Sequence, residues 1–318
     1  MANKRILITG CAGFIGFHLA SFLKSMGMYV VGLDNFNDYY DPKLKGDRAY
    51  ELEKINITVV REDICNQQKV VELLEQHKIT HLVHLAAQAG CRYSLVNPET
   101  YLKTNIEGFF HILEACKKVV GTRLVYASSS SVYGKNEKIP FAVGDSTDKP
   151  ANIYGMTKKT KELMAFTYYS LFNMGSVGLR FFTAYGPWGR PDMAYYSFAH
   201  AIRDGKPIDL YNFGNMRRDF TYIDDIIHGI YTSLDIESGY HIFNLGNSHP
   251  EPLEKLVELL EQELGKKAIK NLLPMPATEI VETYADIEES KRLLGFHPKI
   301  PLQVGISRFV QWFKKYHK

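Results

Sequence analysis

A glycine-rich turn near the start of the chain limits most strongly what this sequence can fold into. Gly10, Gly13 and Gly16 follow the apolar run Arg5–Thr9 and precede a stretch whose apolar residues recur every three or four positions. In such a strand–turn–helix unit the first glycine allows a tight turn, the second lets a pyrophosphate approach the backbone, and the third lets helix and strand pack closely. The helix N-terminus also offers free N–H groups to phosphate. The pattern therefore predicts a dinucleotide-binding unit.

The first half of the chain repeats this alternation of β-branched runs and amphipathic stretches, which is typical of a parallel sheet covered by helices. We expect helices near residues 14–26, 70–74, 106–115 and 154–171. The sequence thus predicts an α/β fold with a Rossmann-type doubly wound parallel sheet. The predicted strands are Arg5–Thr9, Tyr29–Leu33, Thr58–Arg61, His81–His84, Leu124–Ala127 and Val177–Phe181.

Beyond Thr183, prolines and glycines break the chain into shorter elements. Turn-rich segments of this kind often carry binding loops. We expect two domains, since 318 residues exceed the usual size of one. Residues 1–180, with a returning segment near 217–235, would form the dinucleotide-binding domain. Residues 181–318 would mainly form a smaller C-terminal α/β domain that binds the substrate.

Two acidic residues end neighbouring predicted strands. Asp34 closes the second strand, 18 residues beyond Gly16, close to the spacing of about 20 found in dinucleotide-binding units. A carboxylate there accepts hydrogen bonds from a ribose diol and repels a 2′-phosphate, which indicates NAD rather than NADP. Asp63 closes the third strand, where it would either meet the adenine end or simply cap the strand.

The composition excludes several other classes of protein. Hydrophobic residues make up 45% of the chain, which is enough for a packed core and argues against disorder. The net charge of +3 comes from interspersed acids and bases, so nucleic acid is not an expected partner. No apolar stretch approaches the ~20 residues of a membrane span, and the first residues do not resemble a signal peptide.

The positions of cysteines and histidines argue against a metal site. The cysteines form no CxxC pair, and His77 and His81 straddle an expected helix-to-strand junction. Reduced thiols and a cytoplasmic location are therefore the expectation. The cysteines are Cys11, Cys65, Cys91 and Cys116.

A tyrosine and a lysine four residues apart, Tyr154 and Lys158, stand at the start of the fourth expected helix and share one helix face. A tyrosine is a poor base at neutral pH until a nearby ammonium stabilises its phenolate. The serines 128–131 end the fifth predicted strand, and ligands of open α/β sheets bind beyond the carboxyl ends of strands. These hydroxyls should therefore face the bound dinucleotide.

With these motifs the chain resembles the extended short-chain dehydrogenase/reductase family of nucleotide-sugar enzymes along essentially its whole length. The resemblance implies bound NAD, with Tyr154 as the general base and Lys158 lowering the pKa of Tyr154 and holding the nicotinamide ribose. It implies that Ser129 hydrogen-bonds the sugar 4-hydroxyl, with the neighbouring serines as the alternatives. The residues that it assigns to NAD binding are Gly10, Gly13, Phe14, Ile15, Gly16, Asp34, Asn35, Asn37, Asp63, Ile64, Leu85, Ala86, Ala87, Asn105, Tyr154 and Lys158.

The two positions after the implied catalytic serine narrow the reaction. Family members that eliminate water place an Asp-Glu pair there, and those that decarboxylate UDP-glucuronate place a glutamate at the second position. This chain has Ser130 and Ser131, and neither hydroxyl can replace an acid–base carboxyl. The reaction that remains is reversible hydride transfer through a transient 4-keto sugar, which is 4-epimerisation.

Segments 35–42, 86–95, 180–183 and 185–194 resemble the UDP-glucuronate 4-epimerases in particular. This resemblance implies epimerisation to UDP-galacturonate without loss of CO2, with neutral donors at the C6 carboxylate and arginine forks at the pyrophosphate. The chain departs from the family at residues 276–279, where Pro-Ala-Thr-Glu replaces the usual Pro-Gly-Asp turn. The implied carboxylate donors are Ser130, Ser131 and Thr183, with Arg92 nearby, and the implied pyrophosphate ligands are Arg190 and Arg218.

Other functions remain open from the sequence. A 4-epimerase of UDP-glucose or UDP-N-acetylglucosamine is the nearest alternative, a UDP-glucuronate decarboxylase is another, and an NAD-binding redox-sensing module is the non-enzymatic one. The Tyr154/Lys158 pair argues against the sensor, because such modules tend to lose it. The resemblance also implies a homodimer joined by a four-helix bundle, formed by the helix after the fourth strand and the Tyr154 helix.

Overall fold

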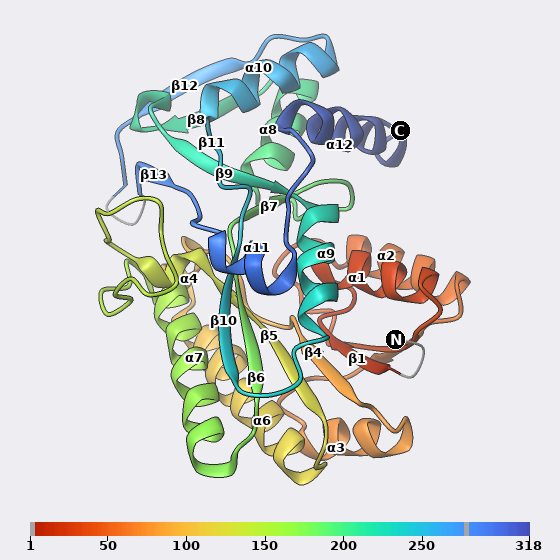
Figure 1. Cartoon of the computed structure of the whole chain (residues 1–318). Coiled ribbons are helices and arrows are strands. Elements are labelled where there is room, and N and C mark those ends of the chain that lie inside the picture. Colours follow the sequence, from red (N-terminus) through yellow and green to blue (C-terminus); the bar gives the residue numbers. More distant parts are fainter. Residues whose placement is uncertain (1–3, 277–279) are drawn as a thin grey trace.

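The computed structural model describes residues 4–276 and 280–318. At its centre lies a parallel sheet of seven strands, seen in the lower half of Figure 1. The strand order β10-β6-β5-β4-β1-β2-β3 places the start of the chain inside the sheet, which then grows outwards in both directions. The predicted doubly wound α/β fold is confirmed. The strands are β1 (Arg5–Thr9), β2 (Tyr29–Asp34), β3 (Thr58–Arg61), β4 (His81–His84), β5 (Arg123–Ser129), β6 (Ser176–Phe181) and β10 (Tyr240–Leu245).

Helices cover both faces of this sheet because its strands are apolar on both sides. Ile6 and Ile8 of β1 belong to one buried cluster, whereas Leu7 between them belongs to the other, as expected when side chains alternate along a strand. Figure 1 shows the helices on either side. One face packs against α1 (Phe14–Ser25), α2 (Pro42–Lys54) and α9 (Ile223–Ser233), and the other against α3 (Gln67–Gln76), α6 (Gly108–Lys118) and α7 (Ile153–Phe172).

The remaining strands build two smaller sheets in the upper half of Figure 1. Helices α8, α10 and α12 pack together there, and α11 packs against β10. β10 returns to the large sheet after the segment 217–235. The four-stranded sheet contains β7 (Thr183–Tyr185), β9 (Arg217–Tyr222), β11 (Pro250–Pro252) and β13 (Glu282–Thr283), and the two-stranded sheet β8 (Pro207–Tyr211) and β12 (Ile269–Leu273). The helices are α8 (Ala194–Asp204), α10 (Leu253–Leu264), α11 (Glu288–Leu294) and α12 (Leu302–Tyr316).

Short helices complete the chain, and two of them continue into longer ones. α5 runs into the π-helix η1, which runs into α6, so the expected helix at 106–115 begins earlier than its apolar pattern indicated. Within residues 4–276 and 280–318, no helix is both long and apolar enough to cross a membrane. The short helices are α4 (Tyr93–Val96), α5 (Pro98–Tyr101), η1 (Leu102–Glu107), η2 (Ser130–Tyr133) and η3 (Asn212–Gly214).

Candidate functional site

A cavity of about 990 Å³ opens at the carboxyl ends of the strands of the large sheet. Its walls come from the segments after β1, β2, β4 and β5, from the first turn of α7, and from α8, β8 and β9. All but two of the predicted site residues line this cavity. They are Gly10, Gly13, Phe14, Ile15, Gly16, Asp34, Asn35, Asn37, Ile64, Leu85, Ala86, Ala87, Arg92, Ser129, Ser130, Ser131, Tyr154, Lys158, Thr183, Arg190 and Arg218.

The glycine turn lies against the segment after β4 and leaves no room for side chains. Gly10 has a φ of +73°, and a Cβ there would lie 2.7 Å from the Ala86 nitrogen. A Cβ at Gly16 would lie 2.1 Å from the Gly10 carbonyl oxygen. Gly13 precedes α1, and within the described part of the chain no side chain caps this helix at that position. The first N–H groups of α1 therefore offer a cradle that fits a pyrophosphate.

Asp34 lies at the end of β2, beside this cradle. Its carboxylate accepts hydrogen bonds from the backbone N–H groups of Ala12 at 3.0 Å and Phe36 at 2.8 Å. Burial raises the pKa of Asp34, and these bonds and the charges of Lys45 and Arg48 oppose that rise. Because Asp34 also lines the cavity, its carboxylate suits the ribose diol of NAD.

Asp63 and Asn105 are the two predicted residues that do not line the cavity, and both hold segments that do. Asp63 accepts hydrogen bonds from the Asn35 side-chain amide and from the Cys65 N–H, each at 2.8 Å. Asn105 is fully buried in η1 and exchanges two hydrogen bonds with the backbone of Gln88, at 2.9 and 3.0 Å. Both side chains therefore position the cavity wall in this structure.

Arg48 of α2 is a residue that the sequence analysis missed. It is fully buried, and its guanidinium donates hydrogen bonds to the carbonyls of Ala12 (2.9 Å), Trp188 (2.6 Å) and Gly189 (2.8 Å) and to the Tyr40 hydroxyl (2.7 Å). One side chain thus ties the glycine turn to the segments after β2 and β7. A single arginine in a stretch of mixed charge carries no sequence pattern that would have revealed this role.

Tyr154 and Lys158 lie one turn apart at the beginning of α7, and both face the cavity beside the serine run. The Lys158 ammonium lies 5.5 Å from the centre of the Tyr154 ring and donates a hydrogen bond to the Ala127 carbonyl at 2.9 Å. Tyr154 is hydrogen-bonded to Ser129. A Cβ at Gly155 would lie 2.5 Å from a backbone oxygen of the serine run, so a glycine at this position lets α7 approach the serines closely.

The four serines occupy different environments. The Ser128 hydroxyl donates a hydrogen bond of 2.6 Å to Glu162, a buried carboxylate that also binds the guanidinium of Arg180. The Ser129 hydroxyl accepts a hydrogen bond from the Ser131 N–H at 3.1 Å. Glu162 thus holds the Ser128 hydroxyl, whereas the Ser129 hydroxyl is the one hydrogen-bonded to Tyr154.

Burial controls the titration of the Tyr154/Lys158 pair. It raises the pKa of Tyr154 to about 12, although the Arg190 charge and the Ser129 hydrogen bond oppose it. Burial, helped by the charge of Arg190, lowers the pKa of Lys158 to about 7. Each group favours the charged form of the other, so a phenolate on Tyr154 and an ammonium on Lys158 stabilise one another.

The low pKa of Lys158 predicts a pH-dependent cost in stability. Below pH 7 the folded chain must bury a charged ammonium, and this cost disappears between pH 7 and the ordinary lysine pKa of about 10.4, because there the unfolded chain binds more protons. We therefore expect Lys158→Met to melt at a higher temperature than the wild type at pH 6.5, with the difference shrinking towards pH 10. Differential scanning calorimetry across this range measures it.

The exposed residue Lys255 provides the control for this experiment. Lys255→Met should shift the melting temperature equally at all these pH values. A Lys158→Met difference that grows with pH would contradict the prediction.

An ion pair and a tyrosine line the same cavity. Arg190 donates a hydrogen bond to Asp192 at 3.0 Å, and the Tyr39 hydroxyl donates one to the other oxygen of Asp192, also at 3.0 Å. The charge of Arg190 lowers the pKa of both Tyr154 and Lys158, so its guanidinium acts on this pair as well.

The other two predicted arginines lie against β8 and β9. The Arg92 guanidinium stacks over the ring of Tyr211, 4.2 Å from its centre. Arg218 donates a hydrogen bond to the Val281 carbonyl at 3.0 Å. The carboxylate of the neighbouring Asp219 accepts hydrogen bonds from the backbone N–H groups of Asn247, Ser248 and Ala285. Of the unusual Pro-Ala-Thr-Glu segment, residues 277–279 lie outside the described residues.

Comparison with known proteins agrees with this geometry. The model of the NAD dependent epimerase/dehydratase family matches residues 6–246. The chain is 46% identical over 330 residues to UDP-glucuronate 4-epimerase 4 of Arabidopsis thaliana, covering 98% of this chain and 76% of that protein. It is 44% identical over 332 residues to Protein CapI of Staphylococcus aureus, covering 99% of each.

A solved structure gives the same result. The UDP-glucuronic acid 4-epimerase from Bacillus cereus, in complex with UDP-glucuronic acid and NAD, matches with a TM-score of 0.91 at 34% identity, covering 98% of this chain and 100% of that one. The fold that positions the glycine turn, Asp34 and the Tyr154/Lys158 pair therefore has a solved counterpart. On the match to residues 6–246 and these identities, the chain belongs to the NAD-dependent epimerase/dehydratase family.

Proposed function

We propose that this protein is a UDP-glucuronate 4-epimerase, which interconverts UDP-glucuronate and UDP-galacturonate through a transient 4-keto sugar and retains the C6 carboxylate. The observation that carries the proposal is that Ser129, Tyr154 and Lys158 meet in the same cavity as the glycine cradle and Asp34. The glycine cradle and Asp34 would hold NAD there, and NAD would supply reversible hydride transfer at C4 of the sugar. No net oxidation results, so the reaction is an isomerisation.

The protein residues manage the proton of the 4-hydroxyl. Tyr154 accepts this proton as a phenolate and gives it back when the keto group is reduced. The Lys158 ammonium stabilises the phenolate, and the Ser129 hydroxyl, bonded to Tyr154, holds the 4-oxygen in line with it. The Lys158 side chain is buried, which limits the access of water to its ammonium and strengthens its interaction with the phenolate.

Retention of the carboxylate needs a further explanation, because the keto intermediate is a β-keto acid. It loses CO2 when the bond to the carboxylate aligns with the π system of the carbonyl. Ser130, Ser131 and Thr183 line the cavity as neutral hydroxyl donors, which would hold the carboxylate away from that alignment, with Arg92 nearby. At the two positions after Ser129 there is also no carboxyl group to protonate an enolate.

We propose that the two parts of the chain bind different ligands. We assign NAD to residues 1–180 with the returning segment near 217–235, and the UDP-sugar mainly to residues 181–318. The return of β10 to the large sheet supports a returning segment. Arg190 lines the cavity from the second part and Arg218 lines it from the start of the returning segment, and the forks of both arginines suit the pyrophosphate of UDP.

We also propose a homodimer built on η1, α6 and α7. These helices expose large apolar side chains, which a four-helix bundle between two copies would cover. The exposed apolar side chains of these helices are Leu102, Phe110, Leu163, Phe166, Leu171 and Phe172.

We further propose a location in a reducing compartment such as the cytoplasm. The four cysteines, which are all free thiols, support it.

Proton NMR of purified protein incubated with UDP-glucuronate alone tests the proposed reaction. We expect signals of UDP-galacturonate to grow to a constant ratio with those of the substrate. A UDP-pentose product would instead identify a decarboxylase. Turnover of UDP-glucose or UDP-N-acetylglucosamine with none of UDP-glucuronate would identify the alternative 4-epimerases, and no turnover of any of these sugars would favour a binding module.

A further inference from the structure

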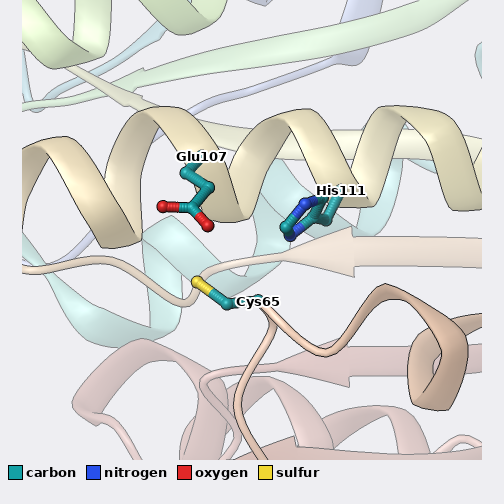
Figure 2. A group of neighbouring side chains, drawn as sticks. All are labelled: Cys65, Glu107 and His111. Carbon is teal, nitrogen blue, oxygen red and sulfur yellow. The ribbon is translucent and has the colours of Figure 1, made fainter.

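Three side chains with metal-binding atoms meet outside the cavity, on the side of α6 that faces α3. They are Cys65, from the turn after β3, and Glu107 and His111, which lie one turn apart at the junction of η1 and α6. One ligand atom from each lies within 4.8 Å of the others. Figure 2 shows the thiol, the carboxylate and the imidazole ring turned towards a common space between the turn and the helix.

The backbone is built to bring this turn and this helix together. Gly108 follows Glu107 directly, and a Cβ there would lie 2.6 Å from Cδ1 of Ile64 and 3.5 Å from the Cys65 sulfur. A side chain at position 108 would have to displace the Ile64 side chain, which packs between the helix and the turn. A glycine within the cluster thus leaves room for Ile64 and Cys65 to pack directly against the helix.

The imidazole of His111 is a second reason to expect a ligand at this cluster. Within the described part of the chain its Nδ1 atom is buried and has no hydrogen-bond partner. Burying such a nitrogen without a partner costs free energy, so a histidine in this state calls for a ligand. The Cys65 thiol makes a weak contact of 3.7 Å with the Lys103 carbonyl and is hydrogen-bonded to the Asp63 side chain, and a metal would have to replace both contacts.

We propose that Cys65, Glu107 and His111 bind a divalent, thiophilic cation of the zinc class. Thiolate, imidazole and carboxylate are the three ligand types that zinc takes in proteins, with water completing a tetrahedron. Metal–ligand distances of about 2.0–2.3 Å place ligand atoms about 3.5 Å apart. The cluster must close by about an ångström, and the exposed side chain of Glu107 can make that movement. On binding, the thiol releases its proton to water.

The site would act as a clamp rather than as part of the reaction. Cys65 does not line the cavity, but its neighbour Ile64 does, and Asp63 holds Asn35 of the cavity wall. A metal that joins this turn to the helix containing Asn105 therefore stiffens the side of the cavity assigned to the adenosine half of NAD. This inference is independent of the identity of the sugar substrate.

Titration of untagged, metal-stripped protein with Co²⁺ and Zn²⁺ tests the proposal. We expect one Co²⁺ per chain, with a thiolate-to-cobalt charge-transfer band in the near ultraviolet that one equivalent of Zn²⁺ removes. Cys65→Ser should lose the band entirely. His111→Gln and Glu107→Gln should weaken Co²⁺ binding at least tenfold. Zn²⁺ should also raise the melting temperature of the wild type and not that of Cys65→Ser.

The exposed His228 on α9 provides the matched control, since His228→Gln removes a surface imidazole away from the cluster. This variant should bind Co²⁺ as the wild type does. A charge-transfer band that survives in Cys65→Ser, or a stoichiometry well below one in the wild type, would overturn the proposal. The circular dichroism spectrum of each variant before metal is added separates loss of the site from loss of the fold.

Discussion

Replacing Tyr154 with phenylalanine is expected to lower kcat for UDP-glucuronate by roughly 100- to 10,000-fold, the range for loss of a general acid–base group. This corresponds to about 3–5 kcal/mol of transition-state stabilisation. The change removes one oxygen atom, hydrogen-bonded to Ser129 and close to the Lys158 ammonium, and leaves the ring in place. KM should change little, because the proton transfer stabilises the transition state more than the bound substrate. Initial rates followed by proton NMR measure both constants.

Two controls separate chemistry from folding in this experiment. Tyr154→Phe should still bind NAD, detected by equilibrium dialysis, since the glycine cradle and Asp34 are untouched. Tyr50→Phe removes a hydroxyl from an exposed tyrosine on α2 and should turn over like the wild type. Wild-type kcat in Tyr154→Phe would remove Tyr154 from the mechanism and leave the assignment of the general base without support.

The large sheet was predictable because its signals are local. β3 and β4 have the predicted bounds, and α7 begins one residue before Tyr154. Strands that are covered on both faces are continuous apolar runs, and such runs are recognised without knowledge of their neighbours. The sequence analysis did not predict the two smaller sheets. Some of their strands have only two or three residues, and these strands pair with distant segments of the chain.

Helix α2 shows a different limit of sequence reasoning. Its first turn carries the expected signals: the Asp41 side chain accepts a hydrogen bond from the Lys43 N–H at 2.9 Å, and Pro42 stands at the first position. The helix is nevertheless mostly polar, and among its buried side chains are the charged residues Lys45 and Arg48. Charged residues are normally exposed, so hydrophobic periodicity cannot identify a helix whose buried face contains them.

The residues of the site were largely predictable, whereas their partners were not. The glycine turn, Asp34 and the Tyr154/Lys158 pair follow motifs with fixed spacing. Arg48 and the cluster at Cys65 join residues tens of positions apart in the sequence. Cys65 lies 42 residues before Glu107. The sequence analysis searched for metal ligands only among closely spaced residues, so it did not find this cluster. Contacts of this kind come from the tertiary fold.

Glu162→Ala is expected to destabilise the protein by about 3–5 kcal/mol, the usual cost of removing one partner of a buried ion pair. The carboxylate of Glu162 binds the Arg180 guanidinium through two hydrogen bonds of 2.8 Å, and their side chains are 3% and 4% exposed. Among the described residues, the hydrogen-bond partners that the variant leaves to the buried guanidinium are the Tyr133 hydroxyl and the Val143 carbonyl. Urea denaturation measures the change in free energy of unfolding.

An exposed ion pair provides the control for this experiment. Glu288 and Lys291 form an ion pair with a distance of 2.6 Å, but their side chains are 76% and 36% exposed, so Glu288→Ala should cost at most about 1 kcal/mol. Replacing both buried partners, as in Glu162→Leu with Arg180→Met, should restore much of the stability, since no uncompensated charge remains. Activity should not recover in the double variant, because the Ser128 hydroxyl, which Glu162 holds at 2.6 Å, is then free to turn beside Ser129. Equal costs for Glu162→Ala and Glu288→Ala would show instead that water reaches Arg180.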